Sequence, residues 1–229
     1  MHEKETILDK IGRVISVAGN GVLMNLLFLV SCIPVVTIGQ AWSALLTAVR
    51  YQIRGDRWFD GFKAGFKRRW LRGSIAWCIM LAADIYFLLD MRYAYIAVQT
   101  NPDATVPFIA ACVMFALAAM VTLSLQLLNV YVPTPVGDWV RNAVNIVFKV
   151  PVELLVAAGL YWLPAVLFLM WDQAFAYFLM IFVAAYYTIV ALGITLLMKN
   201  ALIRYLLQAR TDGTLLAEEG ANASQKEEE

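Results

Sequence analysis

The sequence predicts an all-α integral membrane protein, a polytopic bundle of transmembrane helices, on the strength of its composition and its charge distribution. Of its 229 residues, 62% are hydrophobic and only 15% are charged, whereas a soluble domain is roughly 45–50% apolar and about 25% charged. Eight of the eighteen Lys and Arg residues fall between Arg50 and Arg72, next to a stretch from Val14 to Val49 that carries no charge. A soluble fold of this size could not bury so much apolar surface, but a bilayer can.

Two apolar segments precede the basic window. Val14–Ile33 has the roughly 20 residues that a helix needs to cross a bilayer core, and Pro34 ends it. Val36–Val49 is apolar but short, since at about 1.5 Å per residue it reaches only part of the way across. We expect it to form a re-entrant or kinked helix, or a span completed by Tyr51 and the long stems of nearby arginines.

Four further apolar segments follow the basic window, and together with the first they give five clear spans. Each is long enough to cross a membrane as a helix. Pro151 suits the first helical position of the fourth span, because its missing N–H is not needed there. The four segments are Ser74–Met91, Val106–Val132, Val152–Met170 and Ala174–Met198.

The joins between the spans alternate in charge, which predicts the orientation. Arg50–Arg72, Val136–Val150 and the segment after Met198 carry Lys or Arg, whereas Ala97–Thr105 and Trp171–Gln173 carry none. Because Lys and Arg are retained inside, we expect the three basic segments, including the C-terminus, to be cytoplasmic. Residues 1–208 are expected to form one membrane-embedded domain, followed by a disordered acidic tail at 209–229.

The run Ile33-Pro-Val-Val-Thr-Ile-Gly39 interrupts the N-terminal apolar block. Pro34 removes a hydrogen-bond donor, Gly39 frees the backbone, and the hydroxyl of Thr37 can satisfy an exposed backbone group. One interpretation is a broken helix that lines a substrate site. The other is a tight hairpin or kink at the outer interface, and the pattern alone does not exclude either.

Within the basic window, aromatic residues recur at steps of three and four, which predicts one helical face. We expect an amphipathic helix on the cytoplasmic surface, with its aromatic face in the bilayer and its cations toward anionic headgroups. A second interpretation is that the aromatic face docks a partner protein. The aromatic face consists of Phe59, Phe62, Phe66 and Trp70, and the basic face of Lys63, Lys67, Arg68 and Arg69.

The first third of the chain resembles the YesL family of bacterial integral membrane proteins, which is classed as a domain of unknown function. The resemblance rests on Asn25–Gly39 with its Cys-Ile-Pro-Val-Val-Thr-Ile-Gly run, on Ala44–Arg54, and on the Phe-rich basic helix after them. It implies a helical protein of the bacterial cytoplasmic membrane and an association with carbohydrate utilisation, with a sugar ABC transporter or another membrane protein as partner. It brings no catalytic residue with it.

Asp84 lies near the middle of the predicted span Ser74–Met91. An ionisable residue at that depth is costly and by default suggests a function. The structural interpretation is a carboxyl group that hydrogen-bonds to Asn25, Gln126 or Asn129 inside the bundle. The functional interpretation is a proton- or cation-coupled path, and both stay open.

The sequence lacks the motifs of several common kinds of active site and binding site. The chain has no GxxxxGK[ST] phosphate loop, its one histidine is His2, and no cysteine pair has zinc-site spacing. We therefore expect no enzyme, catalytic residue, metal or cofactor, and no nucleic-acid binding, while a homo-oligomer stays open. The leading hypothesis is a non-enzymatic accessory or regulatory protein of a carbohydrate-uptake system. The alternative is a small-solute or ion transporter or channel that uses Asp84 and the Pro34–Gly39 break.

Overall fold

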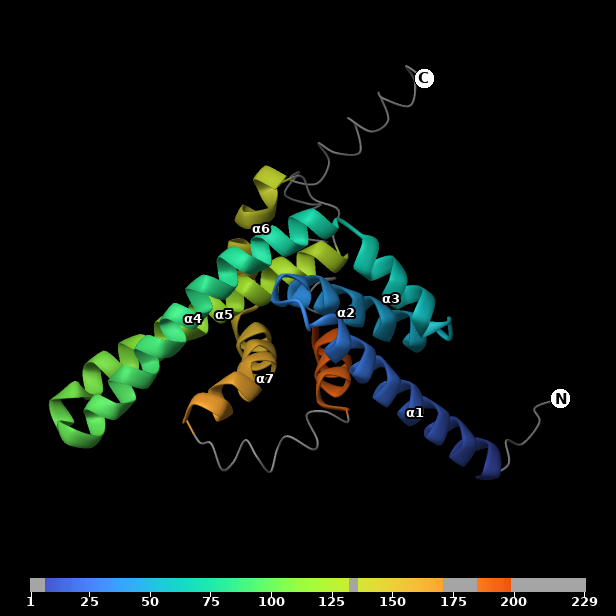
Figure 1. Cartoon of the computed structure of the whole chain (residues 1–229), viewed down its shortest axis with the longest axis horizontal. Helices are drawn as coiled ribbons and strands as arrows, with labels where there is room; N and C mark the ends of the chain where they lie inside the picture. The colour runs from blue at the N-terminus through green and yellow to red at the C-terminus, as the bar shows by residue number, and fades with distance from the viewer. Residues whose placement is uncertain (1–6, 132–135, 171–184, 199–229) are drawn as a thin grey trace, which may run out of the picture.

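The computed structural model describes residues 7–131, 136–170 and 185–198, and every regular element in these ranges is a helix (Figure 1). The predicted all-α class is confirmed. Two short 3₁₀ turns, η1 (Val35–Thr37) and η2 (Pro102–Ala104), connect longer helices. The helices are α1 (Ile7–Ser31), α2 (Ile38–Arg54), α3 (Trp58–Lys67), α4 (Trp70–Thr100), α5 (Thr105–Tyr131), α6 (Val136–Lys149), α7 (Pro151–Met170) and a last helix over Tyr187–Met198.

Three helices of the described residues are long and apolar enough to cross a membrane. They are α4, α5 together with η2, and α7, and they correspond to three of the predicted spans. Ser16–Ser31 within α1 and the helix Tyr187–Met198 are shorter apolar helices. The part of the predicted span Ala174–Met198 before residue 185 and the predicted tail at 209–229 lie outside the described residues.

Helix α2 corresponds to the short apolar helix predicted at Val36–Val49, and it lies inside the protein. Trp42, Leu45 and Leu46 have no exposed surface, and α2 packs against α1, α3, α4 and α5. Its many small residues allow neighbouring helices to approach closely. The segment is apolar because protein surrounds it, and it does not need the length of a membrane span.

Helices α2 and α3 form a tight hairpin. Gly55 closes α2 in the left-handed conformation, with φ 85°, which glycine adopts without strain. Two glycines of α3 then face α2: Gly61 lies against the side chain of Tyr51, and Gly65 lies against the backbone of Ala44. The predicted surface helix exists, but it packs on protein along this glycine face.

Helices α4 and α5 form a long antiparallel pair that extends away from the other helices (Figure 1). Helix α4 has 31 residues and so is about 46 Å long at about 1.5 Å per residue, which exceeds a bilayer core of about 30 Å. The turn η2 lies at the tip of the pair, whereas α3 and α6 lie near its other end. The two basic joins that the structure describes therefore lie near one end of the pair, and the join without Lys or Arg at η2 lies at the other.

Helix α6 occupies the join Val136–Val150, for which the sequence analysis predicted no helix. Its buried residues Trp139, Ala143, Ile146 and Val147 recur at helical spacing. The indole Nε1 of Trp139 donates to the carbonyl oxygen of Leu125 in α5 at 3.2 Å. This contact fixes α6 against the basic end of α5.

Candidate functional site

Asp84 lies fully buried in the middle of α4. Its Oδ2 is 2.6 Å from Oγ1 of Thr122 on α5. The predicted partners were therefore wrong. Asn25 instead accepts from the backbone N–H of Tyr187 at 2.9 Å, and Gln126 accepts from Ser43 at 3.1 Å.

The hydrogen bonds of Thr122 indicate the protonation state that fits this pair. Thr122 Oγ1 also lies 3.0 Å from the carbonyl oxygen of Ala118, yet a hydroxyl has only one hydrogen to donate. A neutral Asp84 resolves this, because its O–H donates to Thr122 and Thr122 then donates to Ala118. Asp84 Oδ1 has no hydrogen-bond partner among the described residues.

Aromatic rings enclose the pair from the side of α7. The ring of Trp162 lies 6.4 Å from that of Trp77 and 6.0 Å from that of Phe115. Trp77 precedes Asp84 by two turns on α4, and Phe115 precedes Thr122 by two turns on the antiparallel α5. Because α4 and α5 are antiparallel, Trp77 lies toward the basic end of the pair and Phe115 toward its tip, and Trp162 lies between these two rings at about the level of the carboxyl group.

A seam of polar side chains lies on the other side of this pair, between α2, α4 and α5. Ser43 Oγ donates to Gln126 Oε1 at 3.1 Å, and Asn129 Nδ2 lies 3.4 Å from Ser43 Oγ. Gln40 Nε2 lies 2.7–3.0 Å from three carbonyl oxygens at the C-terminal end of α3, those of Gly65, Phe66 and Arg68. The sequence analysis missed this seam, although the polar spacing on α5 could have indicated it.

The residues of the predicted helix break do not meet Asp84. Pro34 is exposed in the turn between α1 and α2. Thr37 Oγ1 lies 2.6 Å from the carbonyl oxygen of Ser31, as expected for a hydroxyl that satisfies a free backbone group. Gly39 lies in the core, where an added Cβ would collide with Trp77 and Gln126. The break is a surface hairpin, and only Gly39 borders the polar seam.

The predicted basic and aromatic surface is only partly continuous. Phe62 is buried, and its ring stacks on that of Phe66 at 6.3 Å. Phe59 is exposed, with the Lys63 ammonium group 4.4 Å from its ring centroid. Trp70 does not share their helical face, because Arg69 adopts φ 49° between α3 and α4.

The remaining predicted cations differ in their surroundings. Arg68 donates to the carbonyl oxygen of Val130 at 3.2 Å, which caps the C-terminal end of α5. Lys67 is exposed at the end of α3, and Arg69 is half-buried. Arg50 approaches the same Val130 oxygen at 3.5 Å, with its guanidinium group 4.4 Å from the ring of Tyr131.

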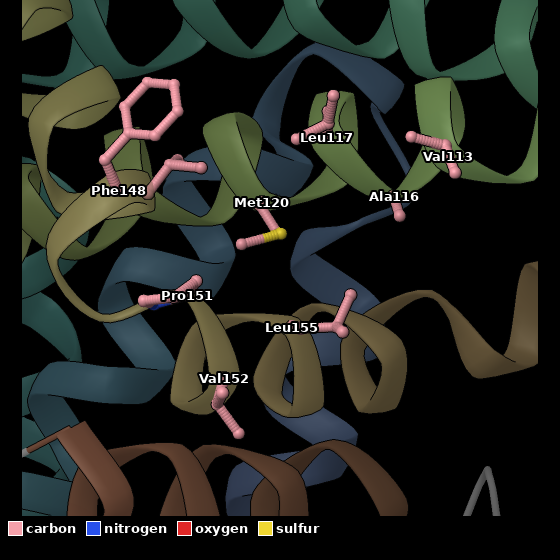
Figure 2. A pocket seen from close by; sticks show the side chains of 9 residues that line it. Val113, Ala116, Leu117, Met120, Phe148, Pro151, Val152 and Leu155 are labelled. Carbon is pink, nitrogen blue, oxygen red and sulfur yellow. The ribbon is translucent and has the colours of Figure 1, made fainter. Parts of the chain in front are cut away.

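Two apolar grooves open on the periphery of the bundle. The first, of about 430 Å³, is lined by α5, α6 and α7, and Figure 2 shows Met120 and Leu155 on facing sides of it. The second, of about 490 Å³, lies between α1, α2 and the helix Tyr187–Met198. Asp84 lines neither groove. Among the described residues, no group of His, Cys, Asp or Glu could hold a metal ion.

The fold and its long apolar helices define a polytopic all-α membrane protein. Residues 22–91 match a family model described as "Protein of unknown function, DUF624". This region contains α2, α3, the C-terminal part of α1 and most of α4, and therefore includes Gln40, Ser43 and Asp84. No curated protein and no solved structure matches the chain.

Proposed function

We propose that this chain is a non-enzymatic accessory protein of a bacterial carbohydrate-uptake system, located in the cytoplasmic membrane. The outward face of α3 carries this proposal. The helix is fixed to the core through Gly61, Gly65 and Phe62, so it presents a rigid exposed surface. That surface carries Phe59, Lys63 and Lys67.

The chemistry of this face suits a contact with another protein. Lysine beside an exposed aromatic ring provides both apolar area and charge, and aromatic anchors contribute much of the affinity of protein interfaces. The link to sugar uptake rests on the resemblance of the first third of the chain to the YesL family. A component of the uptake transporter is the partner that this resemblance supports.

A transporter is the second candidate, because one observation favours it. The polar seam between α2, α4 and α5 approaches a buried carboxyl group, and such residues mark substrate or ion pathways in membrane proteins. Against it, Phe115 and Trp162, whose rings lie 6.0 Å apart, close the side of Asp84 toward the tip of the α4–α5 pair.

Sugar uptake in a deletion strain separates the two candidates. The strain would carry the wild type, Asp84→Asn, or the charge-reversal pair Lys63→Glu and Lys67→Glu, at matched membrane levels. The accessory role predicts that uptake survives Asp84→Asn and falls with the α3 pair. Loss of uptake with Asp84→Asn alone would favour the transporter, as would uptake by the purified protein in vesicles that contain no other protein.

A further inference from the structure

The polar seam continues from Asp84 to the basic end of the molecule. On α5, Thr122, Gln126 and Asn129 are spaced four and three residues apart, so they share one face. On α4, Ser74 and Asp84 are both buried, although a separation of ten residues puts them about 80° apart around the helix axis. The polar face of α5 meets α4 where Thr122 contacts Asp84.

Helix α2 completes the seam at its basic end. Ser43 joins Gln126 and Asn129 by hydrogen bonds of 3.1 and 3.4 Å. A Cβ placed on Gly73 would lie 2.4 Å from Gln40 Oε1 and 3.1 Å from Asn129 Nδ2, so both amides border that glycine. The carbonyl oxygens at the end of α3, which Gln40 caps, form the outer limit of the seam.

The seam contains more polar atoms than its own hydrogen bonds satisfy. The side chains of Gln40, Ser74, Asp84 and Asn129 are each at least 98% buried. Gln40 Oε1, Ser74 Oγ, Asp84 Oδ1 and Asn129 Oδ1 have no hydrogen-bond partner among the described residues. Polar contacts that merely hold helices together leave few such atoms, because each one costs about 1–3 kcal/mol.

We propose that this seam is a proton path, which lets Asp84 exchange its proton with the compartment at the basic end of the bundle. The Asp84 carboxyl group is the binding site, its ligand is a proton, and Thr122, Gln126, Ser43 and Asn129 line the route. The path ends at Asp84, because Phe115, two turns from Thr122 toward the tip of the α4–α5 pair, and the ring of Trp162 at 6.0 Å from it close the far side. This inference is independent of the accessory role, which places no demand on Asp84.

The charges around the seam are consistent with a mouth, at the basic end, that is open to solvent and with an interior that contains no ionised group. Helix α5 contains no charged residue, and α2 carries its charges, Arg50 and Arg54, at its C-terminal end. From α7, Tyr161 is the titratable group that interacts electrostatically with Asp84. Arg68 and Arg69, in the link between α3 and α4, and Arg72, in the first turn of α4, lie at the mouth, where they favour the release of a proton from the seam into solvent.

Infrared spectroscopy of the purified protein in lipid vesicles tests the proposal. A carboxylic acid gives a C=O band that ionised carboxylates lack, and the band of Asp84 is the one that disappears in Asp84→Asn. We expect this band to shift when D₂O replaces water, and to decrease as the pH rises. A band that neither exchanges over hours nor titrates would overturn the proposal, as would the absence of a protonated Asp84 band at every pH.

A single methyl group can test the route. Gly73→Ala places a Cβ against both Gln40 Oε1 and Asn129 Nδ2, and we expect it to slow the exchange at Asp84 at least tenfold. The matched control is Gly159→Ala, since Gly159 has open space around its Cβ position, and its exchange should equal that of wild type. Equal exchange in both variants would contradict the route.

If Gly73→Ala does not fold, a second variant tests the same route. Gln126→Met keeps the length of the side chain but removes its polar atoms from the middle of the seam. It should slow the exchange as well, whereas Thr195→Val, which removes a buried hydroxyl from another helix, should not. Thermal unfolding of each variant identifies those that are folded, and unchanged exchange in folded Gln126→Met would overturn the proposal.

Discussion

At the scale of single residues, the burial of Asp84 could be predicted from the sequence, whereas its hydrogen-bond partner could not. Its burial follows from its position in the middle of a long apolar segment, and the structure confirms it. Its partner does not follow, because Asn25, Gln126, Asn129 and Thr122 are all plausible until the register between α4 and α5 is known. That register depends on packing between helices, which no local pattern encodes.

The hydrogen bond between Asp84 and Thr122 leads to a prediction about stability. Asp84→Asn should change the free energy of unfolding by less than about 1 kcal/mol, because an amide N–H can donate to Thr122 as a neutral carboxyl does. Thr122→Val should cost about 1–3 kcal/mol, since Asp84 then keeps no partner for either oxygen. Thermal unfolding in mild detergent measures both, and a larger effect of Asp84→Asn would indicate an ionised Asp84.

A second prediction concerns the glycine contact between α2 and α3. A Cβ on Gly65 would lie 2.8 Å from the Cα of Ala44, so Gly65→Ala forces the backbones apart and should cost about 1–3 kcal/mol. Gly159→Ala is the control, because its Cβ meets nothing within 4 Å and alanine favours a helix by about 1 kcal/mol. Equal melting temperatures for the two variants would mean that α3 is not held at this contact.

At the scale of helices, the sequence predicts where apolar helices occur better than what surrounds them. The ends of α5 and α7 were predicted to within one residue, and Pro151 begins α7 as expected, whereas α4 ends nine residues beyond its predicted span. The contacts that surround α2 could not be predicted, because lipid and protein interior select the same apolar side chains. Helix α6 was missed because its segment was examined for charge, while the spacing of Trp139, Ala143 and Ile146 already indicated a buried helical face.

The packing of α3 against the core of the protein leads to a prediction at this scale. Changing Phe62 and Phe66 together to Asp should damage the protein more than changing Lys63 and Lys67 together to Gln. Phe62 is 5% exposed and Phe66 packs against the core, so the aspartates would carry charge into the α2–α3 contact. Both lysines are exposed, and surface charges contribute about 1 kcal/mol or less. Expression level and melting temperature measure the difference, and similar values for the two pairs would contradict the embedded face.

At the scale of the whole molecule, the alternation of charge agrees with the arrangement of the helices. The basic helix α3 and helix α6 lie near one end of the α4–α5 pair, and η2 lies at its other end (Figure 1). The sequence could predict this because a span necessarily separates the joins on its two sides. It could not predict the length of the pair, because α4 continues well beyond both ends of the predicted span Ser74–Met91.

The two ends of the α4–α5 pair should therefore face opposite compartments, with α3 in the cytoplasm. In a variant without the three native cysteines, Asn101→Cys marks the tip and Lys63→Cys marks the exposed face of α3. A thiol reagent that cannot cross membranes should label Asn101→Cys in intact spheroplasts, and should label Lys63→Cys only after the cells are permeabilised. Labelling of both in intact spheroplasts would place α3 outside the cytoplasm and would remove a cytoplasmic partner from the proposed function. The reverse pattern would invert the orientation and move the mouth of the proton path to the outer side.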